Sequence, residues 1–231
     1  MLLAQDFYKV ADCQLAHEIA AEYLEGKGID EWQNLYDDGY LEDMEDMPED
    51  VGFTVRSGAT KIVLIPQDED FVVKIPIYGD AEWGGAFWTG AASPELSKRG
   101  YDVDCNDYCE LESCFYECAR EEGVEQFFVP TYYGGMIGDI PYYLQPRITF
   151  IYSKATHSNG DEYTYASING SDAIDPDVGA ELLMYYTVED VARFLAFINL
   201  FGINDLSAKR NGWYTNEYHR YVFWDYAGFH D

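Results

Sequence analysis

The stretch GFTVRSGATKIVLIPQDEDFVVKIPIY, residues 52–78, decides the fold class because it holds three strands in quick succession. GFTVR and KIVLIP are rich in β-branched residues and are joined by the turn SGAT, which is the pattern of a β-hairpin. FVVKIPIY follows the polar turn QDED as a third strand. Because side chains alternate along a strand, Phe71, Val73 and Ile75 are predicted on one face and Lys74 on the other.

The elements after this stretch predict an α+β protein. A helix is expected over 106–122, with Asn106 or Asp107 as its N-cap and Gly123 as its end. QFFVPTYYGGMI and PYYLQPRITFI indicate two more strands. The plan is therefore five antiparallel strands with one helix after the third, followed by a mostly helical part.

The remaining segments are assigned from composition and periodicity. Residues 7–27 carry a helical pattern, and residues 36–50 hold eight acids and no base, which predicts an acidic loop. Residues 79–104 and 153–180 are predicted as loops. Thr187 opens an amphipathic helix. The tail is predicted as a polar turn, GINDLSAKRNG, and one strand from Tyr218 to Trp224. The predicted buried stripe of the amphipathic helix is Val191, Phe194, Leu195, Ile198 and Phe201.

The composition excludes some partners. The chain has 231 residues, with 43 acids against 14 bases and a net charge of −29. Such a charge opposes direct binding to nucleic acid and to anionic lipid, so any partner chosen by charge should be basic. A surface that only keeps the protein soluble explains the charge equally well. No run is long and apolar enough to cross a bilayer and no signal pattern opens the chain, so a cytoplasmic location is expected.

Four of the five cysteines lie at 105, 109, 114 and 118, a spacing that suggests a metal site. On one helix, however, Cys105 and Cys109 share a side, while Cys114 and Cys118 point to nearly the opposite side. One ion cannot be held by all four. Reduced thiols that fill the core are the favoured interpretation.

Lys74 is the first candidate site residue. Within so apolar a strand, it either faces water at a sheet edge or lies in a cleft beside an acid, because an unpaired buried ammonium is costly. Glu112 falls at the edge of the apolar face of the helix 106–122, between Ala119 and Tyr116. A glutamate turned toward the core needs a cation, and Lys74 is the predicted partner. The alternative is an exposed lysine and a boundary glutamate.

A second group of polar residues follows the long helix. Asp205 and Asn211 lie in the loop GINDLSAKRNG, and Asp225 ends the strand in VFWDYAG, twenty residues beyond Asp205. Two acids and an amide on adjacent loops suit Mg²⁺ held through oxygen atoms beside substrate phosphates. The alternative is that Asp205 caps a turn and Asp225 merely ends a strand.

Together these motifs resemble the protein-kinase-like superfamily, and especially the small kinase-like proteins encoded by bacteriophages. The hairpin around Gly58 resembles the glycine-rich loop, and VVKIP resembles the strand whose lysine contacts the nucleotide phosphates. YYLQPRI resembles the hinge that holds adenine, around Gln145 and Arg147, while INDLSAKRNG and WDYAG resemble the catalytic and metal-binding loops.

The resemblance implies ATP and Mg²⁺ as cofactors. Asp205, Lys74 and Glu112 are then the catalytic residues; Gly58, Lys74, Gln145 and Arg147 bind the nucleotide; and Asp225 and Asn211 bind the metal. The implied organisation is a segment 1–50 that packs on the domain, a kinase-like N-lobe over 51–150, and a truncated C-lobe over 151–231.

Some positions depart from the superfamily pattern. Arg210 stands five residues after Asp205, where an asparagine is usual, and Ile203 replaces the usual histidine. Three functions therefore stay open: a phosphotransferase acting on a protein or small-molecule hydroxyl, a degenerate kinase-like binding protein, and an unrelated α+β domain. The binding protein is envisaged as a phage-encoded inhibitor or DNA mimic that captures a basic host protein in the host cytoplasm.

Overall fold

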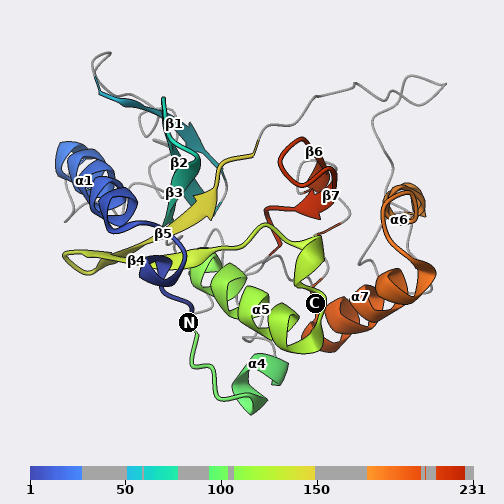
Figure 1. Ribbon diagram of the computed structural model, residues 1–231. Coiled ribbons are helices and arrows are strands. Elements are labelled where there is room, and N and C mark those ends of the chain that lie inside the picture. The colour runs from blue at the N-terminus through green and yellow to red at the C-terminus, as the bar shows by residue number, and fades with distance from the viewer. Residues whose placement is uncertain are drawn as a thin grey trace. The chain divides into compact units, whose positions relative to one another are not determined.

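A computed structural model describes residues 1–27, 51–58, 60–77, 94–103, 107–148, 176–203, 206 and 212–226 of the chain. These residues form two compact units, labelled by element in Figure 1. The first unit comprises Met1–Cys118 and Pro130–Arg147, and the second comprises Ala119–Val129 and Ile148–Asp231.

The first unit is built on a five-stranded sheet whose neighbouring strands are all antiparallel. The spatial order is β1-β2-β3-β5-β4, so the third strand lies in the centre. This confirms the α+β class and the five antiparallel strands predicted from the sequence. The strands are β1 (Phe53–Ser57), β2 (Lys61–Pro66), β3 (Phe71–Pro76), β4 (Tyr132–Ile137) and β5 (Ile140–Pro146).

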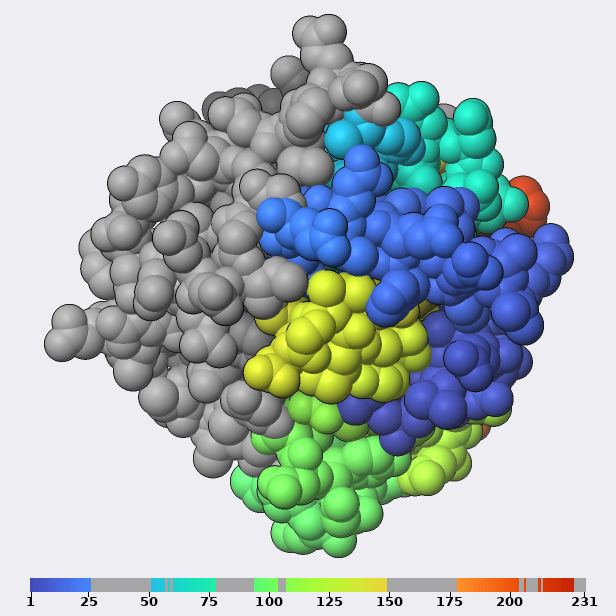
Figure 2. All heavy atoms as spheres, turned by 90° about the vertical axis from the view of Figure 1, so that its left-hand side faces the viewer, coloured from blue at the N-terminus to red at the C-terminus, as the bar shows by residue number. Residues whose placement is uncertain are grey.

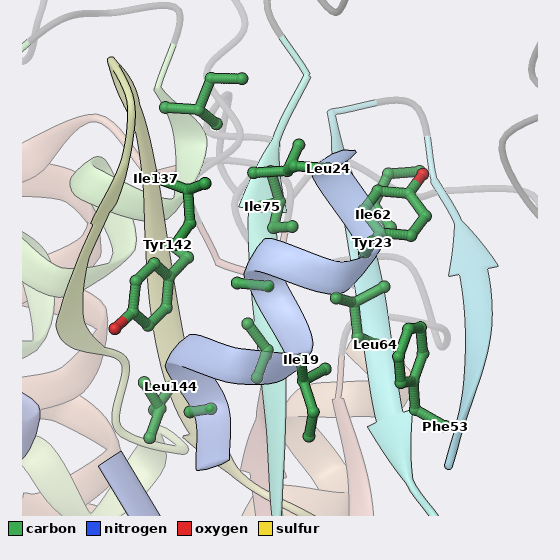
Figure 3. Packing of buried hydrophobic residues seen from close by; sticks show 14 of the residues in the cluster. Ile19, Tyr23, Leu24, Phe53, Ile62, Leu64, Ile75, Ile137, Tyr142 and Leu144 are labelled. Carbon is green, nitrogen blue, oxygen red and sulfur yellow. The ribbon is translucent and has the colours of Figure 1, made fainter. Parts of the chain in front are cut away.

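Helix α1 (Val10–Lys27) covers one face of this sheet. Its residues Ile19, Tyr23 and Leu24 pack against strand residues such as Ile62 and Ile75 in one buried cluster (Figure 3). The short helix η1 (Ala4–Asp6) precedes α1, and the backbone N–H of Tyr133 donates to the carbonyl of Leu2, which attaches this end of the chain to β4. The N-terminal helix therefore completes the core of the sheet.

The opposite face of the sheet meets helix α5 (Tyr108–Glu122). Asp107 caps this helix, since its Oδ1 accepts a hydrogen bond from the N–H of Glu110 at 2.8 Å. Gly123 follows the helix at φ +68°, a conformation that glycine adopts without strain. The predicted helix and its two boundaries are confirmed.

Cysteines 109, 114 and 118 lie buried on α5 as free thiols, which confirms the core-filler interpretation for these three. Cys105 lies outside the described residues. Within the described ranges, no group of three or more His, Cys, Asp or Glu side chains is arranged to hold a metal ion.

One predicted loop of the first unit contains a helix. Helix α4 (Pro94–Lys98) occupies the end of the stretch 79–104. The sequence carries a signal for this helix in Pro94, since proline is favoured at the first position of a helix. Glu95 also accepts from Lys98 and Arg99 one turn later, and Leu96 is buried beneath them.

The second unit contains helices α6 (Pro176–Leu182) and α7 (Val188–Phe201), the hairpin β6 (Gly212–Thr215) and β7 (Arg220–Phe223), and the short helix η3 (Glu125–Phe127). Thr187 caps α7, accepting from the N–H of Asp190 at 3.1 Å, as predicted. Two predictions are wrong here. Residues 176–182 form a helix within a predicted loop, and the tail forms a hairpin where one strand was expected.

The buried stripe of α7 differs from the predicted one at one position. Phe197 is buried, whereas Leu195 is only half-buried. Phe194, at the centre of the stripe, stacks on Phe127 at 4.3 Å and on Phe223 at 5.5 Å between ring centroids. An aromatic cluster from η3, α7 and β7 is thus the core of this unit.

None of the described helices is both long and apolar enough to span a bilayer. The predicted acidic loop, 36–50, lies outside the described residues.

Candidate functional site

Lys74 and Glu112 form an ion pair inside the first unit. The Nζ atom of Lys74, in the middle of β3, donates to Oε2 of Glu112 on α5 at 2.8 Å. Glu112 is fully buried and Lys74 is 3% exposed. The pairing predicted from the sequence is confirmed, and the exposed-lysine alternative is wrong because helices cover both faces of the sheet.

A second lysine binds the same carboxylate. Lys61, the first residue of β2, donates through Nζ to Oε1 of Glu112 and is 5% exposed. Val63 lies opposite Lys74 in the β2–β3 register, so Lys61, two residues away, projects from the same face of the sheet as Lys74. Sequence analysis missed Lys61, because a lysine directly after a turn is most often exposed.

Two neutral side chains complete the cluster. The hydroxyl of Thr131 donates to Oε2 of Glu112 at 3.1 Å, and Nε2 of Gln145 donates to the Thr131 hydroxyl oxygen, also at 3.1 Å. Both are buried. Glu112 thus accepts from three buried donors, which is the arrangement that a carboxylate needs inside a protein. The Gln145 side chain is engaged here, and Gln145 lies opposite Val72 in the β3–β5 register.

Arg147 makes contacts within the unit that the sequence did not indicate. Its backbone N–H donates to the carbonyl of Asp70 at 2.8 Å. Its guanidinium donates to the carbonyls of Pro66 and Gln67 at 2.8 and 3.1 Å. These bonds tie the end of β5 to the turn between β2 and β3. Adenine would therefore have to displace the Asp70 carbonyl to accept from the Arg147 N–H.

The predicted phosphate loop is a tight hairpin turn. The N–H of Gly58 donates to the carbonyl of Lys61 at 2.9 Å. A β-carbon at Gly58 would lie 3.5 Å from that same oxygen, an ordinary contact, so the position does not require glycine. Phosphate-binding loops direct free N–H groups at the ligand. Gly58 could donate to a phosphate only if this hairpin bond opened.

A buried acid lies at the start of the helix that carries Glu112. Asp107 is 3% exposed, and its Oδ2 accepts from the hydroxyl of Tyr143 at 2.7 Å. Burial raises the pKa of Asp107 to about 7, although the hydrogen bonds from Glu110 and Tyr143 act in the opposite direction. Small changes in pH near neutrality therefore alter the charge of the Asp107 carboxyl group, which caps α5.

We expect Asp107→Asn to flatten the pH dependence of stability. The raised pKa means that the folded state holds a proton that the unfolded state has lost between about pH 4 and 7. Asp107 therefore lowers the free energy of unfolding as the pH rises through this window, and has no further effect above it. Between pH 5.5 and 7.5 the wild type should lose about 2 kcal/mol more than the variant, which urea denaturation at each pH measures.

Asp102→Asn, at an exposed carboxylate in the same unit, is the control. It removes the same charge and should leave the wild-type pH dependence intact. A wild-type slope in Asp107→Asn would show that the cap does not titrate in this range.

The other predicted site residues belong to the second unit. Asp225 is half-buried just after β7, and the next residue, Tyr226, is buried with its hydroxyl donating to the carbonyl of Val129 at 3.0 Å. Asp205 and Asn211 lie outside the described residues. The joint action of Asp205, Asn211 and Asp225 on a metal stays a prediction.

Comparison with known proteins does not place the chain in a family: no family model, no curated protein and no solved structure matches it.

Proposed function

We propose that this chain is a kinase-like phosphotransferase that uses ATP and Mg²⁺ and acts on a hydroxyl of a protein or small molecule. The observation that carries the proposal is the ion pair between Lys74 on the central strand, β3, and Glu112 on helix α5. Phosphoryl transfer relies on positioning and charge, and a lysine held by a glutamate is a recurring part of kinase sites. The sequence resemblance supplies the remaining parts.

In this proposal each residue has one task. Lys74 contacts the α- and β-phosphates of the bound nucleotide, and Glu112 holds its ammonium in place. Asp225 and Asn211 are the ligands for Mg²⁺, which neutralises phosphate charge when bound. Asp205 orients the substrate hydroxyl and accepts its proton. Lys61 donates to the same Glu112 carboxylate and has no contact with the nucleotide in this proposal.

A second candidate function is a binding protein on a degenerate kinase-like scaffold. Two observations favour it: Lys74 and Glu112 are buried, and Gly58 donates its N–H within the hairpin. With a net charge of −29, the natural partner is a basic protein, for example a host protein captured by a phage product that mimics DNA.

A nucleotide titration distinguishes the two functions. With Mg²⁺ and ATP at about a hundred times the dissociation constant, the wild-type melting temperature should rise by roughly 5 °C or more. Lys74→Met should abolish this rise, because the phosphates lose their cation. The measurement is a thermal-shift series with and without Mg²⁺, each variant being compared with its own nucleotide-free state.

Lys61→Met is the matched control, since both lysines are buried and donate to the same carboxylate. It should keep most of the nucleotide-induced rise. If the wild type shows no rise with any nucleotide, phosphotransfer is rejected in favour of the binding protein. If the rise is equal in Lys74→Met, the nucleotide binds elsewhere.

A further inference from the structure

A groove of about 300 Å³ lies between α1 and the sheet, at the end where β1 begins and β2 ends. Figure 2 shows this face of the molecule, with α1 in blue beside the cyan and turquoise residues of the first strands. The apolar part of its lining is Leu15, Ile19, Phe53 and Pro66. Ile19 and Phe53 are buried members of the core cluster, so this floor is anchored in the fold.

Carboxylates form the rest of the wall. Glu18 and Glu22 come from α1, and Asp68 and Glu69 come from the turn between β2 and β3. Glu18, Glu22 and Asp68 are exposed, and Glu69 is half-buried. Among the described residues that line the groove there is no lysine, arginine or histidine. The groove therefore combines an apolar floor with an acidic rim.

The like charges on this rim lower the stability of the folded protein when no cation is bound. Glu18 and Glu22 are four residues apart on one helix, a spacing at which like charges destabilise the helix. Two more acids, Asp68 and Glu69 from the neighbouring turn, line the same groove. A cation seated between the two elements would relieve this repulsion, which gives the groove a definite charge preference.

We propose that this groove binds an arginine side chain presented by a basic segment of a partner protein. The apolar stem of arginine suits the floor, while its guanidinium reaches the rim. A planar, weakly hydrated guanidinium pairs with carboxylates through two parallel hydrogen bonds, which a lysine ammonium cannot do. A bare divalent ion needs oxygen ligands on most sides, and the apolar floor offers none.

The proposal goes beyond phosphotransfer and gives the second candidate function a location. The groove lies on the α1 side of the sheet, whereas Lys74 and Lys61 project from the opposite face. The test below contains no nucleotide, so its failure is distinguishable from a failure of nucleotide binding.

The test measures the affinity of the whole chain for a fluorescein-labelled glycine- and serine-rich peptide with two arginines, by fluorescence anisotropy at low salt. The matched peptide carries citrulline, the neutral isostere, in place of arginine. We expect the arginine peptide to bind at least tenfold more tightly. Glu18→Gln/Glu22→Gln should weaken its binding roughly fivefold to tenfold, since two solvent-exposed charge contacts are lost.

A steric variant tests the groove independently of charge. A β-carbon at Gly52, which lines the groove, would meet no atom within 4 Å. Gly52→Trp should therefore leave the melting temperature near that of the wild type while its indole fills the groove and removes peptide binding. If Gly52→Trp unfolds the protein, the glutamate pair still decides the question.

The charge-matched control is Asp102→Asn/Asp139→Asn, two exposed carboxylates of the same unit that do not line the groove. This control should bind like the wild type. Equal weakening by the control, or full binding by a folded Gly52→Trp, would assign the affinity to diffuse negative charge and overturn the proposal. Stabilisation by calcium alone, with no binding of the peptide, would assign the groove to a metal ion and overturn it as well.

Discussion

Glu112→Gln is expected to lower the free energy of unfolding of the first unit by about 3 to 5 kcal/mol. The glutamate is fully buried and accepts from both Lys61 and Lys74. A neutral amide leaves two buried ammonium groups without the carboxylate that compensates them, and breaking a buried ion pair from one side carries a cost of this size. Urea denaturation, with hydrogen exchange followed in peptides from β2, β3 and α5, measures the loss and locates it.

Two further variants test whether the loss of the buried carboxylate is the cause of the lower stability. Glu121→Gln, an exposed position on the same helix, should change stability by less than about 0.5 kcal/mol. The triple variant Lys61→Met/Glu112→Leu/Lys74→Met should recover most of the lost stability, because apolar residues of similar volume often replace a buried ionic cluster without loss. A cost below about 1 kcal/mol for Glu112→Gln would mean that the cluster is hydrated and not a buried site.

Phe194→Ala is expected to destabilise the second unit by about 3 to 5 kcal/mol. Phe194 is fully buried and stacks on Phe127 and Phe223, so the substitution removes a large apolar surface and leaves a cavity among rigid rings. Hydrogen exchange in peptides from α7 and β7 should increase, together with a lower midpoint of urea denaturation.

Leu195→Ala is the control for this prediction. It lies beside Phe194 on the same helix but is only half-buried, so its cost should stay near 1 kcal/mol. Similar losses from both substitutions would contradict the aromatic cluster as the core of this unit.

Local sequence patterns were sufficient to predict most of the helices and strands. The strands of residues 52–78 follow from alternating β-branched residues and polar turns, which act over a few residues. The ends of α5 and the start of α7 follow from capping by Asp107, Gly123 and Thr187. The pair of Lys74 and Glu112 was also predictable, because a lysine and a glutamate that are both buried are costly unless they are paired.

The misassigned positions depend on distant neighbours. On α7 the helical period selects Val191, Phe194, Ile198 and Phe201, but both Leu195 and Phe197 flank that stripe equally well. Phe197 is buried because Phe128, from another part of the chain, packs against it at 5.9 Å between ring centroids. Periodicity within one helix carries no information about which flank a partner covers.

The sequence by itself determined the α+β class, the five antiparallel strands and the pairing of Lys74 with Glu112, since each rests on side-chain alternation, capping or the cost of a lone buried charge. Only the tertiary structure decided that α1 covers the second face of the sheet, that Lys61, Thr131 and Gln145 join Glu112, and that α1 and the β2–β3 turn enclose an acidic groove. These features join residues far apart along the chain. Their proximity comes from how helices and strands pack, which no local pattern records.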